Sequence, residues 1–197
     1  LGTVQFGLAY GVAGNAEPIG EIEACDILKL AHSAGVYRID TAPAYGDIEH
    51  RLSRLSGDLD FEFISKIAAQ PEGTADVCIE KSISLSRARL GERLKGVIFH
   101  DSDNVEAHWA VAELYASEHG LRLGASFYDP AGVAKNAGKY SSFAMAQVPG
   151  NAFDQRVAST ARTDIEITMR SAFLQGLLLV PLAEAVKRVP AAKKQLI

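Results

Sequence analysis

Polar residues of complementary chemistry stand at the ends of apolar, β-prone stretches in this sequence. Residues 36–39 lead directly into a carboxylate, Asp40, and the turn that follows places a phenol, Tyr45, on the next loop. Two later apolar stretches end in the same way, one at the ammonium group of Lys66 and one at the imidazole of His100. In a parallel α/β barrel the carboxyl ends of all strands lie on one face, where the chemistry takes place. We therefore expect these four side chains to meet in one pocket.

Together these residue types could protonate a carbonyl oxygen. A free tyrosine has a pKa of about 10, so it is a possible but poor proton donor at neutral pH. A nearby lysine ammonium stabilises the phenolate, and an aspartate keeps that lysine charged and oriented. A histidine can hydrogen-bond the substrate oxygen and orient it. The matching hydride must come from a cofactor, because no protein side chain supplies one.

Each residue taken alone also has a simpler structural interpretation. Asp40 is equally well explained as an ion-pair partner of Arg38 or as a cap of the next turn. His100 is more often a satisfied histidine at a strand end, and Lys66 is also explained as a solvated lysine at the rim. Tyr45 alone indicates almost nothing. The occurrence of all four in order, each at a strand end or in the first loop, favours a functional site.

The elements that must position these residues alternate between strands and helices. Counting the apolar segment 1–6, seven strand–helix units are visible, with no hairpin signal between them. This pattern predicts parallel pairing with right-handed crossovers. The predicted strands are 36–39, 61–64, 96–99, 121–126, 143–148 and 166–170; the predicted helices begin at Pro18, near 48, at 75, at 103 or 104, after 129 and at 177.

A closed barrel of this kind has eight units and usually takes about 250 residues. We therefore expect an α/β fold, a parallel (β/α)8 TIM-type barrel truncated after about seven units, with residues 1–197 forming a single domain whose C-terminal part is missing. An open, doubly wound sheet is the alternative, but no glycine-rich dinucleotide fingerprint follows the first strand. Residues 154–165 leave little room for a crossover helix, so we expect that connection to be irregular.

The bulk composition excludes several classes of function. The net charge of −4 gives no support for nucleic-acid binding, and no apolar run approaches the ~20 residues that span a bilayer. The N-terminus has no basic region ahead of an apolar stretch, so we expect no signal peptide. Cys25 and Cys78 are isolated and lie in helix-like stretches, which favours helix packing in a reducing compartment over a disulfide or metal site. We expect a cytoplasmic protein without a bound metal; the sequence does not indicate its oligomeric state.

Several segments, in the same order along the chain, resemble the aldo-keto reductase family. The resemblance covers nearly the whole chain, and the order and spacing of Asp, Tyr, Lys and His is its most specific part. The matching segments are Leu1-Gly2-Thr3, Ile39-Asp40-Thr41-Ala42 with Ala44-Tyr45-Gly46, Ser65-Lys66, Ile98-Phe99-His100, Gly124-Ala125-Ser126, Gln147-Val148-Pro149 with Asn151, and Arg170-Ser171-Ala172-Phe173-Leu174-Gln175-Gly176.

The resemblance implies an eight-stranded barrel that binds NADPH, or less often NADH, and reduces a small aldehyde or ketone to an alcohol. By position it implies that Tyr45 is the proton donor, that Lys66 and Asp40 tune it, and that His100 orients the carbonyl. It also implies that much of the adenosine and diphosphate contact comes from an eighth strand and its helix, which would follow residue 197. The implied cofactor contacts are Ser126 and Gln147 at the carboxamide, Thr3, Val4 and Asp40 at the ribose, and Ser171 near the diphosphate.

Two positions depart from the family pattern. Phe127 stands where the family often has an asparagine, which puts one carboxamide contact in doubt. Arg170 stands where an aromatic residue often stacks on the nicotinamide. A guanidinium can also stack flat on a ring, so we retain Arg170 as a cofactor-binding candidate.

Two other functions are compatible with these residues. The first is a lyase or aldolase in which Lys66 forms a Schiff base, although a neighbouring Asp40 would keep that lysine protonated. The second is a non-catalytic barrel that serves as a binding module. Borohydride trapping on Lys66 would favour the lyase, and the absence of turnover with cofactor bound would favour the module.

Overall fold

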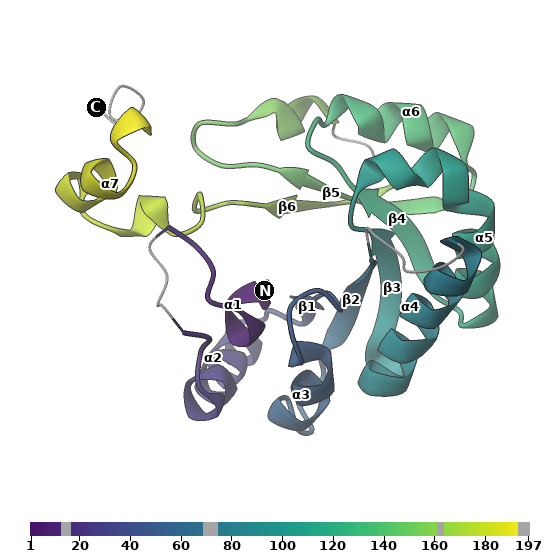
Figure 1. Cartoon of the computed structure of the whole chain (residues 1–197), viewed down its shortest axis with the longest axis horizontal. Helices are drawn as coiled ribbons and strands as arrows, with labels where there is room; N and C mark the ends of the chain where they lie inside the picture. The colour runs from purple at the N-terminus through teal and green to yellow at the C-terminus, as the bar shows by residue number, and fades with distance from the viewer. Residues whose placement is uncertain (13–16, 69–74, 161–163, 193–197) are drawn as a thin grey trace.

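The computed structural model of the chain describes residues 1–12, 17–68, 75–160 and 164–192. Six parallel strands form one sheet in sequential order, and the sheet curls into part of a barrel (Figure 1). This confirms the parallel α/β architecture and excludes the doubly wound strand order. The strands are β1 (Arg38–Asp40), β2 (Glu62–Ile67), β3 (Leu94–Phe99), β4 (Arg122–Ser126), β5 (Phe143–Pro149) and β6 (Glu166–Arg170).

The N-terminal segment only partly resembles the expected first strand. Gly2 forms a parallel bridge with Asp40, and the backbone N–H of Thr3 donates to the Asp40 carbonyl at 3.1 Å. The chain then turns into a one-turn helix, α1 (Val4–Gly7), instead of continuing as a strand. The expectation of seven complete units was therefore too high, because residues 1–6 contribute one bridge beside a six-stranded sheet.

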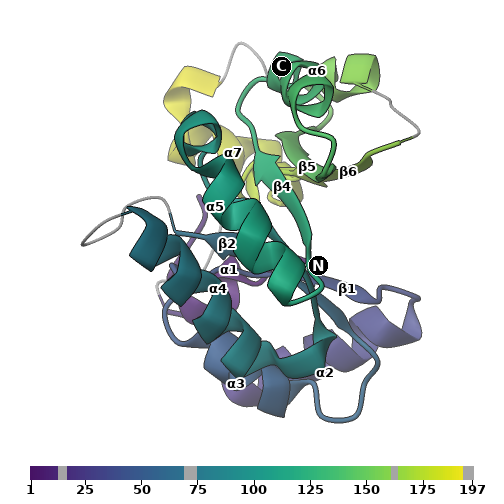
Figure 2. The same ribbon diagram turned by 90° about the vertical axis from the view of Figure 1, so that its right-hand side faces the viewer.

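The helices between consecutive strands from β1 to β5, together with the helix directly before β1, cover the outer side of the sheet. In Figure 1 they surround the lower, right-hand and upper sides of the curled sheet, and Figure 2 shows α4 and α5 next to each other. The helices are α2 (Glu21–Ser33), α3 (Ile48–Leu55), α4 (Ala75–Leu90), α5 (Val105–Glu118), α6 (Ala131–Lys139) and α7 (Leu182–Arg188).

Two helices differ from their sequence predictions. In α2, Ile22 was expected on the buried face but is 83% exposed, and the buried positions are Ala24 and Leu28. The last helix was expected from residue 177, but residues 177–179 form a separate 3-10 turn and α7 begins only after Pro181. Proline lacks a backbone N–H and is favoured at the start of a helix, so it divides the predicted helix.

The inner face of the curled sheet is built in layers, because alternate residues of a strand point to the same side. Ionic side chains form the layer at the amino ends, where Arg38 contacts Glu166 and Glu62 and where Arg122 lies 2.6 Å from Glu166. Since Arg38 is in β1 and Glu166 is in β6, this contact joins the first and last strands of the sheet. The next layer is apolar and contains Ile64, Ile98 and Met145.

Lys66 and Gln147 lie two residues after Ile64 and Met145, Asp40 lies two residues after Arg38, and Arg170 lies four residues after Glu166. The same alternation therefore predicts that these polar side chains share the inner face at the carboxyl ends. The main hydrophobic core lies on the other side of the sheet, where Phe63, Val97 and Leu123 pack with residues of the helices such as Leu52 and Trp109.

The connection from β5 to β6 is irregular, as expected. Its described part contains only a 3-10 turn over Arg156–Thr160, and residues 161–163 lie outside the described part. Cys25 and Cys78 are half-buried in α2 and α4, which agrees with helix packing. Among the described residues no helix is long and apolar enough to cross a bilayer.

Candidate active site

A buried ion pair lies at the carboxyl ends of β1 and β2. The Lys66 ammonium donates to Asp40 Oδ2 at 2.7 Å and to the Thr41 carbonyl at 3.0 Å. The Lys66 side chain is 2% exposed, whereas that of Asp40 is 26% exposed. Asp40 therefore pairs with Lys66, and Arg38 pairs instead with Glu62 and Glu166 at the opposite end of the strands.

Tyr45 and His100 lie next to this ion pair. The Lys66 Nζ atom is 5.1 Å from the centroid of the Tyr45 ring, and the Tyr45 and His100 rings meet edge to face with centroids 6.1 Å apart. Both rings are half-buried, so each combines contact with the protein and access from solvent. The structure therefore brings together the four residues singled out by the sequence.

Two glycines allow the turn that carries Tyr45 to pack closely against α1. A Cβ atom at Gly7 would lie 1.8 Å from the Tyr45 carbonyl oxygen, and a Cβ at Gly46 would lie 2.9 Å from the Gly7 carbonyl oxygen. Gly46 also has a φ of 70°, in the left-handed region that favours glycine. The backbone around Tyr45 is thus held by direct main-chain packing that no larger residue could reproduce.

The electrostatic environment keeps His100 neutral at pH 7. Burial lowers the pKa of the His100 imidazole, and the positive charges of Lys66 and Arg170 lower it further, against the opposing effect of Asp40 and Asp101. A neutral imidazole has one N–H donor and one acceptor nitrogen. His100 can therefore donate a hydrogen bond to an uncharged ligand oxygen without itself being a cation.

The amide of Gln147 connects the ion pair to the next part of the rim. Gln147 Nε2 donates to Asp40 Oδ1 at 2.9 Å, and Ser126 Oγ lies 3.4 Å from Gln147 Oε1. Both side chains are about 95% buried, with exposures of 5% for Gln147 and 6% for Ser126. The two carboxylate oxygens of Asp40 thus bind different partners, one from β2 and one from β5.

Residues at the N-terminus complete this side of the cluster. Thr3 is fully buried, and its hydroxyl donates to the Asp40 carbonyl oxygen at 3.0 Å. Val4 follows at the start of α1 and is half-buried. Thr3 therefore adjoins the Asp40 backbone, whereas no polar side chain is available at position 4.

Arg170 and Ser171 lie at the end of β6. The Arg170 guanidinium donates to the Phe127 carbonyl at 3.2 Å and lies over the ring of Tyr128, with 4.7 Å between Cζ and the ring centroid. Ser171 Oγ is 3.5 Å from Arg170 NH1, and Ser171 has a φ of 59°, which is unusual for a residue with a side chain. The Phe127 ring itself is buried in the core at 2% exposure, so this position contributes a carbonyl oxygen to the rim.

A second polar cluster, which was not predicted from the sequence, lies on the outer side of β2. Glu49 of α3 is 1% exposed, and its carboxylate binds Ser65, Ser86 and Arg89. The sequence contains only a weak signal for it, because Glu49 lies at the edge of the apolar face formed by Ile48, Leu52 and Leu55. Its burial comes from the packing of α3 against β2 and α4, which the helical pattern alone does not indicate.

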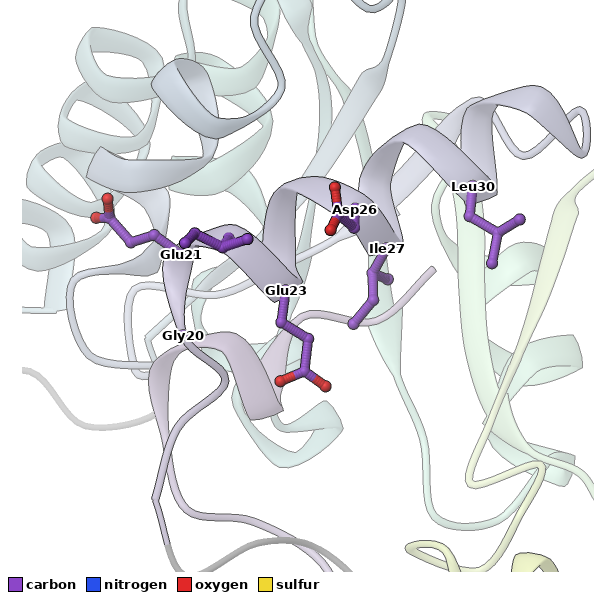
Figure 3. A pocket seen from close by; sticks show the side chains of 7 residues that line it. Gly20, Glu21, Glu23, Asp26, Ile27 and Leu30 are labelled. Carbon is purple, nitrogen blue, oxygen red and sulfur yellow. The ribbon is translucent and has the colours of Figure 1, made fainter.

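A surface hollow of about 560 Å³ lies along α2 (Figure 3). In Figure 3, Glu23, Ile27 and Leu30 project from the same side of the helix. None of the candidate site residues lines this hollow, so it is separate from the cluster around Lys66. Its lining residues are Gly20, Glu21, Ile22, Glu23, Asp26, Ile27 and Leu30.

Within the described residues no group of histidine, cysteine and acidic side chains is arranged to hold a metal ion. Lys66 occupies the inner side of Asp40, so this carboxylate already has a cationic partner. The cluster combines a phenol, an ammonium, a carboxylate and a neutral imidazole, which are groups that can transfer or hold protons.

A parallel sheet curled into part of a barrel, with polar residues converging at the carboxyl ends of its strands, is the arrangement of α/β barrels, which carry their sites on that face. No protein-family model matches the sequence, and no curated protein matches it. Solved structures with a similar fold are nevertheless found. One is PA4992 of Pseudomonas aeruginosa, described as a candidate aldo-keto reductase, with 24% identity and a TM-score of 0.72. The match covers 97% of this chain and 78% of that one.

Two further similar structures are a holo form and a complex with NADPH. The holo form of aldo-keto reductase AKR11C1 from Bacillus halodurans has 18% identity and a TM-score of 0.61, with coverage of 87% of this chain and 62% of that one. A mutant of Gox0644 in complex with NADPH has 14% identity and a TM-score of 0.62, with coverage of 86% and 66%. The resemblance to aldo-keto reductases is thus confirmed as a shared fold.

Proposed function

We propose that this chain is an oxidoreductase of aldo-keto reductase type that reduces a small aldehyde or ketone to an alcohol with NADPH, or alternatively NADH. In this proposal residues 1–197 belong to one (β/α)8 barrel domain. The observation that carries the proposal is the convergence of Tyr45, Lys66, Asp40 and His100 at one end of the sheet. The shared fold with a holo aldo-keto reductase and with an NADPH complex supports it.

The residues at the rim suit a nicotinamide cofactor. Gln147 has both an amide donor and an amide acceptor, and the Ser126 hydroxyl lies beside it, so the pair could bind a carboxamide. Thr3, Val4 and Asp40 would line the ribose, Arg170 would stack on the nicotinamide, and Ser171 would lie near the diphosphate. When bound, the reduced nicotinamide supplies the hydride that no side chain can provide.

Each of the four central residues would have a distinct role in the reaction. Tyr45 would donate its hydroxyl proton to the carbonyl oxygen as negative charge develops there. The Lys66 ammonium favours the phenolate that remains, and Asp40 holds this ammonium in position. The neutral His100 would donate its N–H to the carbonyl oxygen and orient the substrate beside Tyr45.

The central test is a pair of measurements on the wild type and on Tyr45→Phe. NADPH titration followed by fluorescence should show saturable binding for both proteins, because the variant loses only a hydroxyl. Turnover of an aldehyde should fall by about 10²–10⁴-fold in the variant, which is the usual contribution of a general acid. Absence of cofactor binding by the wild type, or full activity of the variant, would contradict the proposal.

The contacts of Lys66 argue against the lyase alternative. A Schiff base requires a free amine, but this side chain is 2% exposed and paired with Asp40. We therefore expect no covalent trapping of a carbonyl compound on Lys66 by borohydride. Mass spectrometry of the digested protein would detect such an adduct.

A further inference from the structure

The buried carboxylate of Glu49 accepts hydrogen bonds from three side chains, one in β2 and two in α4. Oε1 accepts from the hydroxyl of Ser65 and from that of Ser86, the latter at 2.9 Å, and Oε2 accepts from Arg89 at 3.1 Å. The two serine hydroxyls are also 3.3 Å apart, so these groups form one network. Glu49, Ser65 and Ser86 are each at most 1% exposed.

The network connects α3, which follows the turn of Tyr45, to β2, which contains Lys66. Glu49 belongs to α3, which begins directly after the turn containing Tyr45. Ser65 immediately precedes Lys66 in β2, and because side chains alternate along a strand, Ser65 points outward while Lys66 points to the inner face. A single carboxylate therefore links the segment of Tyr45 to the strand of Lys66.

Burial alone does not explain a charge at this position. Ile48 and Leu52 of the same helix are fully buried, so an apolar side chain at position 49 would also fill the space. Buried ion pairs give little net stability compared with well-packed apolar residues, but they can impose one arrangement on the groups that they join. The fixed arrangement here is that of α3 relative to β2.

We propose that Glu49 is a positioning residue for the reaction given under Proposed function: through Ser65 it holds Tyr45 and Lys66 in their productive geometry. The inference rests on that function, but it concerns a group on the opposite side of the sheet that does not contact the ligand. Displacement of a catalytic group by about 1 Å can cost about 10²-fold in rate. Loss of Glu49 should therefore lower kcat with little change in cofactor affinity.

The sharpest test compares Ser65→Ala with Ser86→Ala. Each variant removes one hydroxyl from the same carboxylate oxygen, and only Ser65 adjoins Lys66. We expect similar losses of thermal stability, but a roughly 5- to 20-fold lower kcat only in Ser65→Ala, with KM for the aldehyde and Kd for NADPH within about twofold of wild type. Equal kcat values in the two variants would overturn the proposal.

Glu49 itself provides a second comparison. Glu49→Leu should lower kcat by about 10- to 100-fold, and Glu49→Gln, which keeps an acceptor oxygen for the serines, should recover part of this loss. A folded Glu49→Leu protein with wild-type kcat would show that the network serves stability alone. If Glu49→Leu does not fold, the serine pair still decides the question.

A measurement without turnover separates this inference from the proposed function. In protein labelled with 13C-tyrosine, the NMR signal of the Tyr45 ring can be assigned because it is absent from Tyr45→Phe. Its chemical shift should change in Ser65→Ala and stay the same in Ser86→Ala. That result would support the positioning role even if the wild type reduced no aldehyde. Identical Tyr45 signals in all three proteins would overturn it, whatever the activity.

Discussion

The ion pair between Lys66 and Asp40 should be both buried and energetically coupled, and this can be measured without any substrate. Its atoms are 2.7 Å apart, and the ammonium is 2% exposed. The perturbations are Lys66→Met, which keeps most of the side-chain volume, and Asp40→Asn, which keeps the shape and removes the charge. A third protein carries both changes.

The expected magnitudes follow from the surroundings of each charge. At 2.7 Å and an effective dielectric constant of about 20, the Coulomb energy is about 6 kcal/mol, and the desolvation of the two groups offsets much of it. Removing one partner of a buried pair costs about 3–5 kcal/mol. We expect about 3 kcal/mol for Lys66→Met, because Asp40 is partly exposed and keeps its bond from Gln147, and about 4 kcal/mol for Asp40→Asn, because it leaves a deeply buried ammonium.

The assay is urea unfolding followed by circular dichroism, arranged as a double-mutant cycle. Residues in contact typically have coupling energies of about 0.5–3 kcal/mol, and we expect about 2 kcal/mol or more here. The exposed pair Lys139–Glu106 is a matched control, with a similar separation of 2.8 Å but side-chain exposures of 42% and 70%. Its coupling should be much weaker than that of Lys66–Asp40, because water screens both of its charges.

Additivity would refute this reasoning. If the losses from Lys66→Met and Asp40→Asn sum to that of the double variant within about 0.5 kcal/mol, the two groups do not interact as the structure indicates. A coupling no larger than that of Lys139–Glu106 would have the same meaning. In either case the role of Asp40 in holding the ammonium would have to be abandoned.

Two further predictions concern His100 and Gly7. Because the pKa of folded His100 is depressed below about 6.5, the unfolded chain binds more protons once the pH falls through that value. The contribution of His100 to the free energy of unfolding should therefore be largest above about pH 6.5 and decrease at lower pH. Urea unfolding measured between pH 7.5 and 5 should show a weaker pH dependence of this free energy in His100→Asn than in the wild type. Identical pH profiles of the two proteins would disprove this. Gly7→Ala places a Cβ 1.8 Å from the Tyr45 carbonyl oxygen, so it should lower the free energy of unfolding by about 1–3 kcal/mol or more and also reduce turnover. In the control Gly138→Ala the new Cβ meets nothing within 4 Å, so this change should be neutral or slightly stabilising. Equal effects at both glycines would contradict the close packing at Gly7.

Most strands were predicted well because they are short, largely apolar runs with a polar residue at or just after the end; β6, Glu-Ile-Thr-Met-Arg, is the exception in composition. The predicted strand 166–170 matches β6, and the predicted helix start at 75 matches that of α4. Errors arose where tertiary contacts outweighed local pattern. Ile22 has helical spacing but is exposed, since Ala24 and Leu28 face the neighbouring elements of the fold instead. Residues 1–6 are apolar, yet they form a bridge and a helical turn because Gly7 packs directly against the turn of Tyr45.

The sequence by itself determined the parallel α/β architecture and the set of residues at the strand ends, because alternation and chain order are local properties. Only the tertiary structure decided their partners: Asp40 binds Lys66 and Gln147, while Arg38 binds Glu62 and Glu166 at the other end of the sheet. The Glu49 network likewise depends on the packing of α3 and α4 against β2. These pairings join residues far apart in the chain, and their geometry exists only once the sheet has curled and the helices have packed onto it.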